Sequence, residues 1–419
     1  MGNTPNIRFK GFTDDWEQRK LGDVLVSLQN NTLSRADLSN ESGVAKNVHY
    51  GDVLIKFGEV LDVGKEQLPM ITDESVLSKY KASFLQNGDV IVADTAEDST
   101  VGKCSEIAGV NGDIVLSGLH TIPYRPVEKF ATGYLGYYLN SGAYHNQLIP
   151  LMQGIKVTSV SKSAMQDTDI VYPKSVKEQA MIGNCFQSLD HLITLHQRKC
   201  DETKKLKKFM LQKMFPKKDA KKPEIRFAGF TDDWEQRKLS ELGEIMTGST
   251  PSTSKSEYYS EDGIPWVTPT DINALTIFDT PKKLSKEGMK VARIVPANTI
   301  LCTCIASIGK NALLTVTGSF NQQINSLTPS MKNDAYFLLT ESKFWSDKMK
   351  QMAASGTMQI VNKTAFSELK AMVPTLNEQK LIGSYFRILD DLITLHQRKC
   401  DELKEFKKYM LQNMFPQKG

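Results

Sequence analysis

Two polar segments of the sequence carry side chains suited to recognition by hydrogen bonding. Gln322 and Gln323 lie in the segment 320–325, and His120 stands opposite Gln323 in the parallel segment 117–122. A glutamine amide can make two hydrogen bonds to adenine, and a lysine can bind guanine or a phosphate. The glutamines are equally suited to hold a turn as structural amides. The chemistry of these residues is therefore contact with polar edges, and the same residue types also serve ordinary loops.

Further correspondences extend this pairing of segments. The tripeptide Val-Gly-Lys at 101–103 parallels Ile-Gly-Lys at 308–310, and Lys162 and Lys363 each follow a glycine at similar spacing. The polar run 247–253 predicts a loop that exposes hydroxyls and backbone N–H groups. Such groups suit base edges and phosphates, and they also occur in solvated turns. The pattern indicates a shared scaffold with different polar tips.

Motifs for catalysis and metal binding are missing from the sequence. There is no phosphate-binding loop, nucleotide-binding glycine fingerprint, serine nucleophile elbow or zinc protease motif, and no Asn/Asp-Pro-Pro-Tyr motif of an adenine methyltransferase. The paired carboxylates at 14–15 and 232–233 fit capped turns better than a catalytic pair. No two of the six cysteines form C-x-x-C, and we expect the thiols of Cys302 and Cys304 on opposite faces of a strand. We expect reduced thiols, no zinc and no catalysis.

Length and composition indicate a globular protein of several domains. The chain has 419 residues, of which 40% are hydrophobic and 24% charged, and this favours two to four domains. No apolar run reaches the roughly 20 residues of a membrane helix, and the N-terminus lacks the pattern of a secretory signal. We therefore predict a cytoplasmic protein without membrane contact. The net charge of +4 is too small to indicate a polyanionic partner by itself.

The chain contains a duplicated frame. Residues 7–21 and 225–239 match at fourteen of fifteen positions, and residues 189–218 and 389–418 match at twenty-three of thirty. The segments between them, which we name the first insert (22–173) and the second insert (240–374), are barely alike. Two near-identical frames with dissimilar inserts indicate one common task performed twice and a second task performed in two versions.

Each frame contains a long amphipathic helix with a heptad seam. The seam positions predicted from the alternating spacing of three and four are Ile182, Phe186, Leu189, Ile193 and His196, and Ile382, Phe386, Leu389, Ile393 and His396. Capping boxes at 175–178 and 375–378 predict the helix starts. One such helix cannot bury its own seam, so we expect the two copies to pair antiparallel. The alternative is that each helix packs on its own insert and the two never meet.

The end of the first helix and the residues after it are strongly basic. Segment 198–222 contains eleven Lys or Arg residues and three acidic residues. A lysine-rich helix end is often only a solvated face that suits the helix dipole. The functional alternative is salt-sensitive attraction to phosphates, independent of base sequence.

Taken together, these motifs resemble the specificity subunit of type I restriction–modification systems. The resemblance spans the whole chain and is carried by F-T-D-D-W-E-Q-R-K-L at 12–21 and 230–239, E-Q at 178–179 and 378–379, L-I-T-L-H-Q-R-K at 192–199 and 392–399, and G-I-P-W-V at 263–267 with Q-Q-I-N at 322–325. The first insert matches less closely, since His120 stands where the second insert has Gln323.

The resemblance implies a fold of two α/β (α+β) target recognition domains separated by an antiparallel coiled coil of two long helices. It implies that each domain reads half of a bipartite site in double-stranded DNA, and that the helices set the gap and dock two modification (methyltransferase) subunits. It implies further restriction (translocase/endonuclease) subunits as partners. No cofactor is expected in this chain, because S-adenosylmethionine for adenine methylation belongs to the modification subunit.

We predict domain boundaries at 1–174 and 223–374 for the two recognition domains, with a helix and basic linker at 175–222 and a second helix at 375–419. The residues selected as DNA contacts are Lys103, His120, Lys156 and Lys162 in the first insert, and Thr270, Lys310, Gln322, Gln323 and Lys363 in the second. The competing hypotheses are a non-catalytic coiled-coil adaptor without DNA readout and a stand-alone DNA-modifying enzyme, which the missing motifs oppose.

Overall fold

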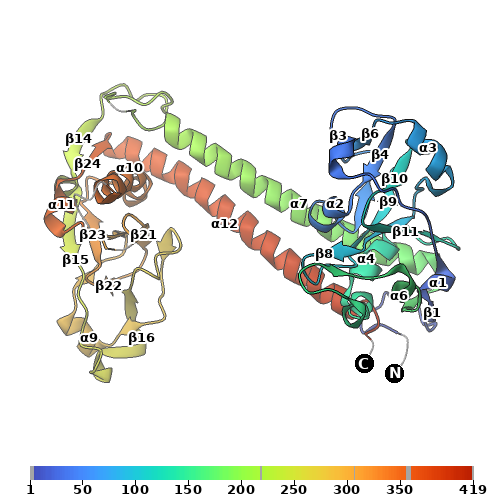
Figure 1. Ribbon diagram of the computed structural model, residues 1–419. Coiled ribbons are helices and arrows are strands. Elements are labelled where there is room, and N and C mark those ends of the chain that lie inside the picture. Colours follow the sequence, from blue (N-terminus) through green and yellow to red (C-terminus); the bar gives the residue numbers. More distant parts are fainter. Residues whose placement is uncertain (1–3, 218, 306, 355–359, 418–419) are drawn as a thin grey trace. The chain divides into compact units, whose positions relative to one another are not determined.

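The computed structural model describes residues 4–217, 219–305, 307–354 and 360–417 (Figure 1). The chain divides into two compact units. The first unit comprises residues 1–197 and 398–419, and the second comprises 198–397. Each unit thus contains one insert and one half of each long helix, α7 (Val176–Lys213) and α12 (Leu376–Asn413).

The first unit is a mixed α/β structure built on two sheets. Its five-stranded sheet has the order β2 (Leu25–Ser27), β11 (Thr121–Pro126), β7 (Val90–Ala93), β9 (Cys104–Ala108), β5 (Val60–Asp62), and its four-stranded sheet has the order β10 (Val115–Ser117), β4 (Ala45–Val48), β6 (Met70–Ile71), β3 (Leu38–Ser39). Two short ladders join β1 (Glu17–Lys20) to β13 (Asp169–Tyr172) and β8 (Thr95–Ala96) to β12 (Thr158–Ser159). The helices are α1 (Leu21–Val24), α2 (Tyr50–Ile55), α3 (Ser75–Tyr80), α4 (Tyr134–Asn140), α5 (Gly142–His145) and α6 (Lys162–Gln166).

The second unit repeats this plan. Its five-stranded sheet has the order β15 (Gly243–Thr247), β23 (Ile324–Pro329), β20 (Thr299–Thr303), β21 (Asn311–Leu314), β17 (Thr276–Ile277), and its four-stranded sheet has the order β18 (Lys283–Leu284), β16 (Tyr259–Val267), β22 (Gly318–Phe320), β19 (Ile294–Val295). A ladder joins β14 (Glu235–Lys238) to β24 (Lys370–Val373). The helices are α8 (Leu239–Leu242), α9 (Lys286–Val291), α10 (Ala335–Ala354) and α11 (Lys363–Glu368).

The two five-stranded sheets share their topology although the inserts share little sequence. In each sheet the central strand, β7 or β20, is antiparallel to both neighbours, and an edge strand, β5 or β17, pairs in parallel. Every residue of both central strands is buried. A run of apolar and β-branched residues suits a strand that is covered on both faces. The predicted mixed α/β architecture is therefore confirmed.

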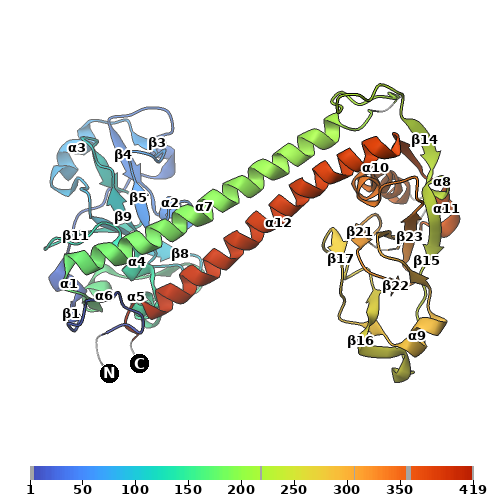
Figure 2. The same cartoon turned by 180° about the vertical axis from the view of Figure 1, so that it is seen from behind.

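Within each unit the two long helices run antiparallel, as predicted. In the first unit the Cys400 thiol lies 4.0 Å from the Ile193 carbonyl oxygen, and in the second unit the Cys200 thiol lies 3.8 Å from the Ile393 carbonyl oxygen. Figure 2 shows the paired segments of α7 (green) and α12 (red). The four residues have matching places in the repeat, so each unit uses the same seam contact.

The ends of the helices also pack on the inserts, but the alternative in which the two helices never meet is wrong, because they pair within each unit. Ile182, Phe186 and Leu189 of α7 belong to the buried core of the first unit, together with Phe415 after the end of α12. Ile382, Phe386 and Leu389 belong to the matching core of the second unit. Further along the seam, Ile193, His196, Ile393 and His396 are half-buried. The heptad pattern therefore describes a single apolar stripe that faces an insert at one end and the other helix beyond it.

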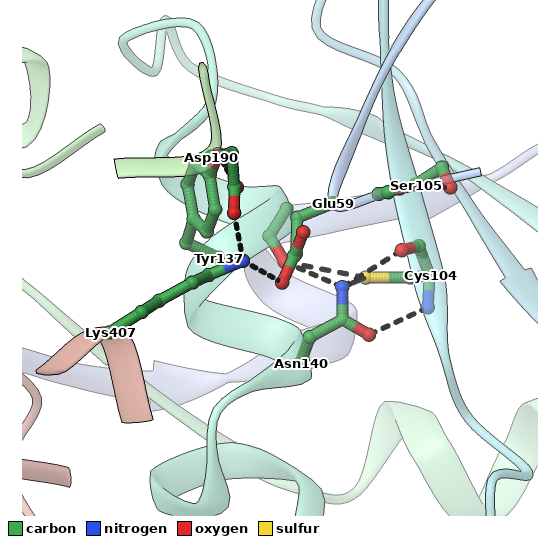
Figure 3. A network of polar contacts seen from close by, with 9 residues as sticks. Glu59, Cys104, Ser105, Tyr137, Asn140, Asp190 and Lys407 are labelled. Carbon is green, nitrogen blue, oxygen red and sulfur yellow. Dashed lines mark hydrogen bonds and ion pairs between the residues drawn. The ribbon is translucent and has the colours of Figure 1, made fainter. Parts of the chain in front are cut away.

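A half-buried lysine ties α12 to the first insert (Figure 3). The Lys407 ammonium lies 2.7 Å from the Asp190 carboxylate of α7 and 2.8 Å from the Glu59 carboxylate, and it sits over the Tyr137 ring. Burial alone would lower the pKa of Lys407, but the two carboxylates outweigh it and raise that pKa. In the second unit Lys207 makes the matching contact with Asp390 at 2.5 Å. Lys407 and its counterpart Lys207 thus both form ion pairs.

The predicted capping boxes are only half correct. The Ser175 hydroxyl accepts from the Glu178 N–H at 3.3 Å, but the Glu178 carboxylate binds the Arg8 guanidinium at 2.6 and 3.0 Å. In the second unit Arg226 binds Glu378 in the same bidentate way, at 2.7 and 2.8 Å. A bidentate Arg–carboxylate pair is stronger than a bond from a carboxylate to a cap amide. The E of each E-Q motif therefore anchors the N-terminal segment of its frame.

The remaining frame motifs are also structural. Trp16 meets the Phe415 ring edge-on at 6.4 Å, and Trp234 meets Phe215 in the same way at 5.7 Å. The Gln179 amide accepts from the Ala131 N–H at 3.0 Å and donates to a backbone carbonyl at the start of α7. These motif residues thus hold the frame together through contacts within its own unit.

The cysteine prediction is corrected at one pair. The six cysteines are free thiols, but Cys302 and Cys304 both belong to the same buried core of the second unit, and the Cys304 thiol donates to the Cys302 carbonyl at 3.4 Å. Residues two apart along a strand lie on the same face, so the expectation of opposite faces is wrong.

Candidate nucleic-acid interface

In the first insert, three loops meet at one end of the five-stranded sheet. Asp94 follows β7, and its N–H donates to the His120 carbonyl at 3.2 Å, while the Val160 N–H donates to the Asp94 carbonyl at 2.9 Å. The backbone therefore fixes His120 and the loop before α6 on either side of Asp94.

These loops border a cleft of about 480 Å³ with a largely polar rim. The lining residues are Ser27, Leu28, Gln29, Asn30, Asp94, Thr121, Ile122, Pro123, Val160, Ser161 and Lys162. Lys162 begins α6, and the Ser161 hydroxyl caps that helix by accepting from the Ala164 N–H at 3.2 Å. The predicted contact Lys162 is thus exposed at the edge of a cleft that offers amides, hydroxyls and one carboxylate.

His120 lies beside this cleft in an unusual conformation. Its φ of 56° is in the left-handed region, which is uncommon outside glycine and in which histidine, asparagine and aspartate are enriched. The ring Nδ1 lies 3.5 Å from the Asp94 carboxylate, and the ring packs edge-on against Tyr50 at 5.3 Å. The side chain is 48% exposed. The ring is therefore held on two sides and open to solvent on another.

The other two residues selected in the first insert differ in their freedom. The Lys103 ammonium donates to the Leu54 carbonyl at 2.7 Å, near the end of α2, and burial lowers the pKa of this lysine. Lys156 is exposed in the turn between Gln153 and Ser159, whose backbones pair. Of the two, Lys156 presents its ammonium to solvent, whereas Lys103 already serves the helix.

The second insert repeats the backbone arrangement with other side chains. The Cys304 N–H donates to the Gln323 carbonyl at 2.9 Å, and the Val361 N–H donates to the Cys304 carbonyl at 3.1 Å. Gln323 thus takes the place of His120, and Cys304 takes the place of Asp94. The correspondence inferred from the sequence between 117–122 and 320–325 is therefore present in the hydrogen bonding.

The polar side chains of this second site hold one another. The Asn321 amide donates to the Gln323 side-chain oxygen at 3.1 Å, and the Gln322 side-chain oxygen accepts from the Thr250 hydroxyl. The loop that carries Thr250 is fixed by the Trp266 indole, which donates to the Ser249 carbonyl at 3.0 Å. Gln322 is exposed and Gln323 is half-buried. Both the structural and the recognition readings of the glutamines thus remain compatible with their contacts.

Three further selected residues surround this site. Lys310 is exposed, and its carbonyl accepts from the Thr303 N–H at 2.9 Å where β20 ends. Lys363 is exposed at the start of α11, as Lys162 is at the start of α6. Thr270 is exposed in the loop after β16, and its hydroxyl lies 2.8 Å from that of Thr268. Contact with DNA stays a prediction for all nine selected residues.

The sequence did not reveal two residues that shape the first site. Neither Asp94 nor Tyr50 was singled out in the sequence. Asp94 could have been detected as a carboxylate in the loop that follows a buried strand, because binding residues are often on loops held by a rigid scaffold, whereas no motif marks Tyr50. Their partner His120 lies 26 residues from Asp94, so only the strand pairing of β7 with β11 brings them together.

The basic segment is partly neutralised by the start of the second frame. Glu224 pairs with both Lys213 and Lys217, which lowers the pKa of this exposed carboxyl to about 2. Lys221 and Lys222 lie 3.7 and 3.4 Å from the Asp233 carboxylate. These four lysines therefore act first as ties between α7 and the second frame, which weakens the phosphate-binding interpretation of the segment.

Apolar side chains are exposed at matching places on the two long helices. Leu192, Phe406 and Tyr409 are exposed in the first unit. Leu392, Leu206 and Phe209, their counterparts in the repeat, are exposed in the second unit. Each unit thus presents the same small apolar surface, which we call the helix patch.

Neither a membrane-spanning helix nor a metal-binding cluster is found in the described part of the chain. Among the residues at 4–217, 219–305, 307–354 and 360–417, no helix combines the length and apolar character needed to cross a membrane. Over the same parts of the chain, no group of three or more histidine, cysteine, aspartate or glutamate side chains is arranged to hold a metal ion.

Comparison with known proteins places the chain in a family. The model of the type I restriction modification DNA specificity domain matches residues 13–205 and again 231–405. The putative type I restriction enzyme MjaX specificity subunit of Methanocaldococcus jannaschii is 23% identical over 95% of this chain and 92% of its own length. Two others, the MjaIX subunit of the same organism and the HindI specificity subunit of Haemophilus influenzae, are each 28% identical; these alignments cover 44% and 39% of the relatives and 44% and 41% of this chain.

A solved structure supports the fold. The crystal structure of the type I restriction-modification system S subunit from M. genitalium covers 99% of this chain and all of its own, with a TM-score of 0.67 and 14% identity. The two matches to the family model coincide with the two copies of the frame and insert, and they account for most of the sequence. The resemblance noted in the sequence is confirmed, and the chain belongs to the family of type I restriction modification DNA specificity domains.

Proposed function

We propose that this chain is the DNA-recognition subunit of a type I restriction–modification complex, and that each insert reads one half of a bipartite site. The observation that carries the proposal is the pair of matched sheet ends. One backbone arrangement presents His120 and Asp94 in the first insert and Gln323 and Cys304 in the second. Different side chains on one scaffold suit two different base sequences, because base edges are distinguished by their donors and acceptors.

The long helices have a second task in this proposal. They hold the inserts at a set separation and thereby fix the gap between the half-sites. Contacts within each unit support a rigid spacer. The start of each long helix is held by an arginine–glutamate ion pair, and the two helices are joined in each unit by a lysine–aspartate ion pair. Adding or deleting whole helical turns in both copies is expected to change the gap. An unchanged gap would contradict the spacer role.

The helix patches are the proposed docking surfaces for two modification subunits. An aromatic and aliphatic cluster left exposed at equivalent places in both units suits two copies of one partner, because exposed apolar clusters commonly mark protein interfaces. The modification subunits would bring S-adenosylmethionine and methylate adenine, and restriction subunits would join the complex in the cytoplasm. The chain itself performs no catalysis, in keeping with the family.

The experiment that tests the function is methylation mapping. We expect that co-expression of the chain with its modification subunit in a methylation-free host yields methylated adenines at one bipartite sequence. The purified chain alone, incubated with DNA and labelled S-adenosylmethionine, is expected to transfer no methyl group. Transfer by the isolated chain would overturn the non-catalytic assignment, and scattered methylation without a common sequence would overturn the reading role.

A salt titration separates this function from that of an adaptor without DNA readout. Binding to duplex DNA should weaken steeply as salt rises, because phosphate contacts release counterions. Exchanging Lys162 and Lys363 for methionine should reduce the slope, whereas the same exchange at Lys65, which pairs with Asp62 away from the cleft, serves as the control. Salt-independent or absent binding would favour the adaptor.

A further inference from the structure

The first recognition site contains an ionisable ring where the second has an amide. His120 and Gln323 occupy the same place in the hydrogen bonding of their sheets. Histidine is the side chain whose charge ordinarily changes between about pH 5 and 8, whereas a glutamine amide does not titrate. The two sites therefore differ in a property that a change of pH can reveal.

The contacts of His120 determine what its second nitrogen can do. The Asp94 carboxylate faces Nδ1 at 3.5 Å and thus favours a proton there. With Nδ1 protonated, the neutral ring offers Nε2 only as an acceptor, and the imidazolium offers it as a donor. Phosphate oxygens and the N7 atoms of purines are acceptors, so they pair with the imidazolium and not with the neutral ring.

Tyr50 and His49 enclose the ring from the side of α2. Tyr50 packs edge-on against His120, and His49 packs against Tyr50 with ring centres 4.7 Å apart. His49 accepts from the Gly51 N–H and so caps α2 with an unprotonated nitrogen. Burial, followed by the nearby Arg35, lowers the pKa of His49. The cap bond and the lowered pKa both favour the neutral form of His49.

The remaining charged groups near the two rings are accounted for. Arg35 lies against Asp52 at 2.6 Å, so its charge is largely compensated. Lys162 lines the same cleft as Asp94 and contributes positive charge there. Asp94 also accepts from the Thr95 hydroxyl at 2.7 Å, which fixes its carboxylate. The ion pair partner of His120 is thus held in place whether or not DNA is present.

We propose that Asp94 and Tyr50 are positioning residues that hold His120 so that its protonated ring donates to an acceptor on the DNA. Recognition of the first half-site is then pH-dependent, and recognition of the second is not. This inference rests on the proposed function, since it concerns how one of the two sites contacts its half of the target. It assigns a role to Asp94 and Tyr50, and it makes the two half-sites distinguishable in solution.

The test uses the full chain with its modification subunits and a duplex carrying the mapped site. Affinity is measured at pH 6 and pH 8 at constant ionic strength. We expect binding to be about tenfold tighter at pH 6, the size of one hydrogen bond to a charged group. His120→Asn should abolish this ratio, because asparagine tolerates the left-handed backbone but does not titrate. Asp94→Asn and Tyr50→Leu should reduce it. His191→Gln, a change at an exposed histidine of α7, should leave it unchanged.

Two further duplexes, each with one half-site scrambled, locate the effect. The pH ratio should vanish with one of them and persist with the other. Equal ratios for wild type and His120→Asn would overturn the inference, and so would a ratio that survives on both scrambled duplexes. If no duplex binds in preference to random DNA, the proposed function itself fails. Because each variant is compared with itself at two pH values, a uniform loss of folded protein cancels in the ratio.

Discussion

The ion pairs of Lys407 predict that the effect of Glu59→Gln on stability changes sign when Lys407 is replaced. In the native protein Lys407 bridges Asp190 and Glu59, and the three side chains are only 15%, 34% and 21% exposed. Lys407→Met removes the cation and leaves two carboxylates that both lay within 2.8 Å of its nitrogen. Breaking a fully buried pair costs about 3–5 kcal/mol. Since both acids keep some solvent, we expect a loss of about 1–3 kcal/mol in the free energy of unfolding.

Glu59→Gln distinguishes repulsion from lost packing. In the native background this change removes a partner of Lys407 and should destabilise the first unit. In the Lys407→Met background it removes one of two facing carboxylates and should stabilise the unit by about 1 kcal/mol. Hydrogen exchange of peptides from 398–413 measures both effects. Lys207→Met is the matched control. Asp390 keeps its hydrogen bond from the Tyr336 hydroxyl at 3.1 Å, and among the described residues the ion pair of Lys207 involves Asp390 as its single carboxylate. The same sign of the Glu59→Gln effect in both backgrounds would refute this explanation.

Three other perturbations follow from the structure. Arg226→Met should lower the free energy of unfolding by about 3–5 kcal/mol in calorimetry, because it leaves the fully buried Glu378 carboxylate without its partner. Arg237→Met, at an exposed pair with Glu235, should lower it by under about 1 kcal/mol. Equal losses would contradict the anchoring role. Burial raises the pKa of Glu341 to about 8, so the folded state keeps a proton that the unfolded state releases above the ordinary pKa of 4.5, and stability falls as pH rises from 4.5 to about 8. Glu341→Gln should remove this pH dependence, which amounts to at most about 5 kcal/mol, from thermal unfolding curves. An unchanged pH dependence would show that the carboxyl is ionised in the folded state. Phe209→Ser and Tyr409→Ser should each weaken capture of the modification subunit while DNA binding by the chain alone persists, and full retention of capture by the double variant would exclude the helix patches as docking surfaces.

The frame was readable from the sequence because its signals are local or repeated. The heptad of α7 and α12 depends on spacing within one segment, and the near-identity of 225–239 with 7–21 shows that both copies fold alike. The correspondence of His120 with Gln323 was also readable, because the flanking strands keep their apolar pattern while the tip changes. In each case the prediction needed the type and order of residues and no knowledge of side-chain direction.

Long side chains were the main source of error. Glu178 was expected to reach back to the cap of its own helix, but it binds Arg8, which lies 170 residues earlier. The Lys103 ammonium reaches the Leu54 carbonyl, a partner that the sequence did not indicate, while its contact with DNA stays a prediction. A lysine or glutamate has several rotatable bonds, so its partner is decided by the best acceptor or donor that the tertiary structure brings within reach. Neither partner carries a motif that sequence spacing can detect.

The division between frame and insert has a physical basis that also limits what a single sequence can reveal. A frame residue such as Trp16 or Arg226 has its partner inside the chain, so any change at one of them leaves a buried group without its contact. The tip residues at 120 and 323 are partly open to solvent, and their contacts with the neighbouring strand ends at 94 and 304 are made through their backbone carbonyls. Side chains there can change without loss of the fold, which is the condition for one architecture to read different DNA sequences. The target bases are consequently a property of exposed loop geometry, and methylation mapping, unlike the heptad or the repeat, reads that property directly.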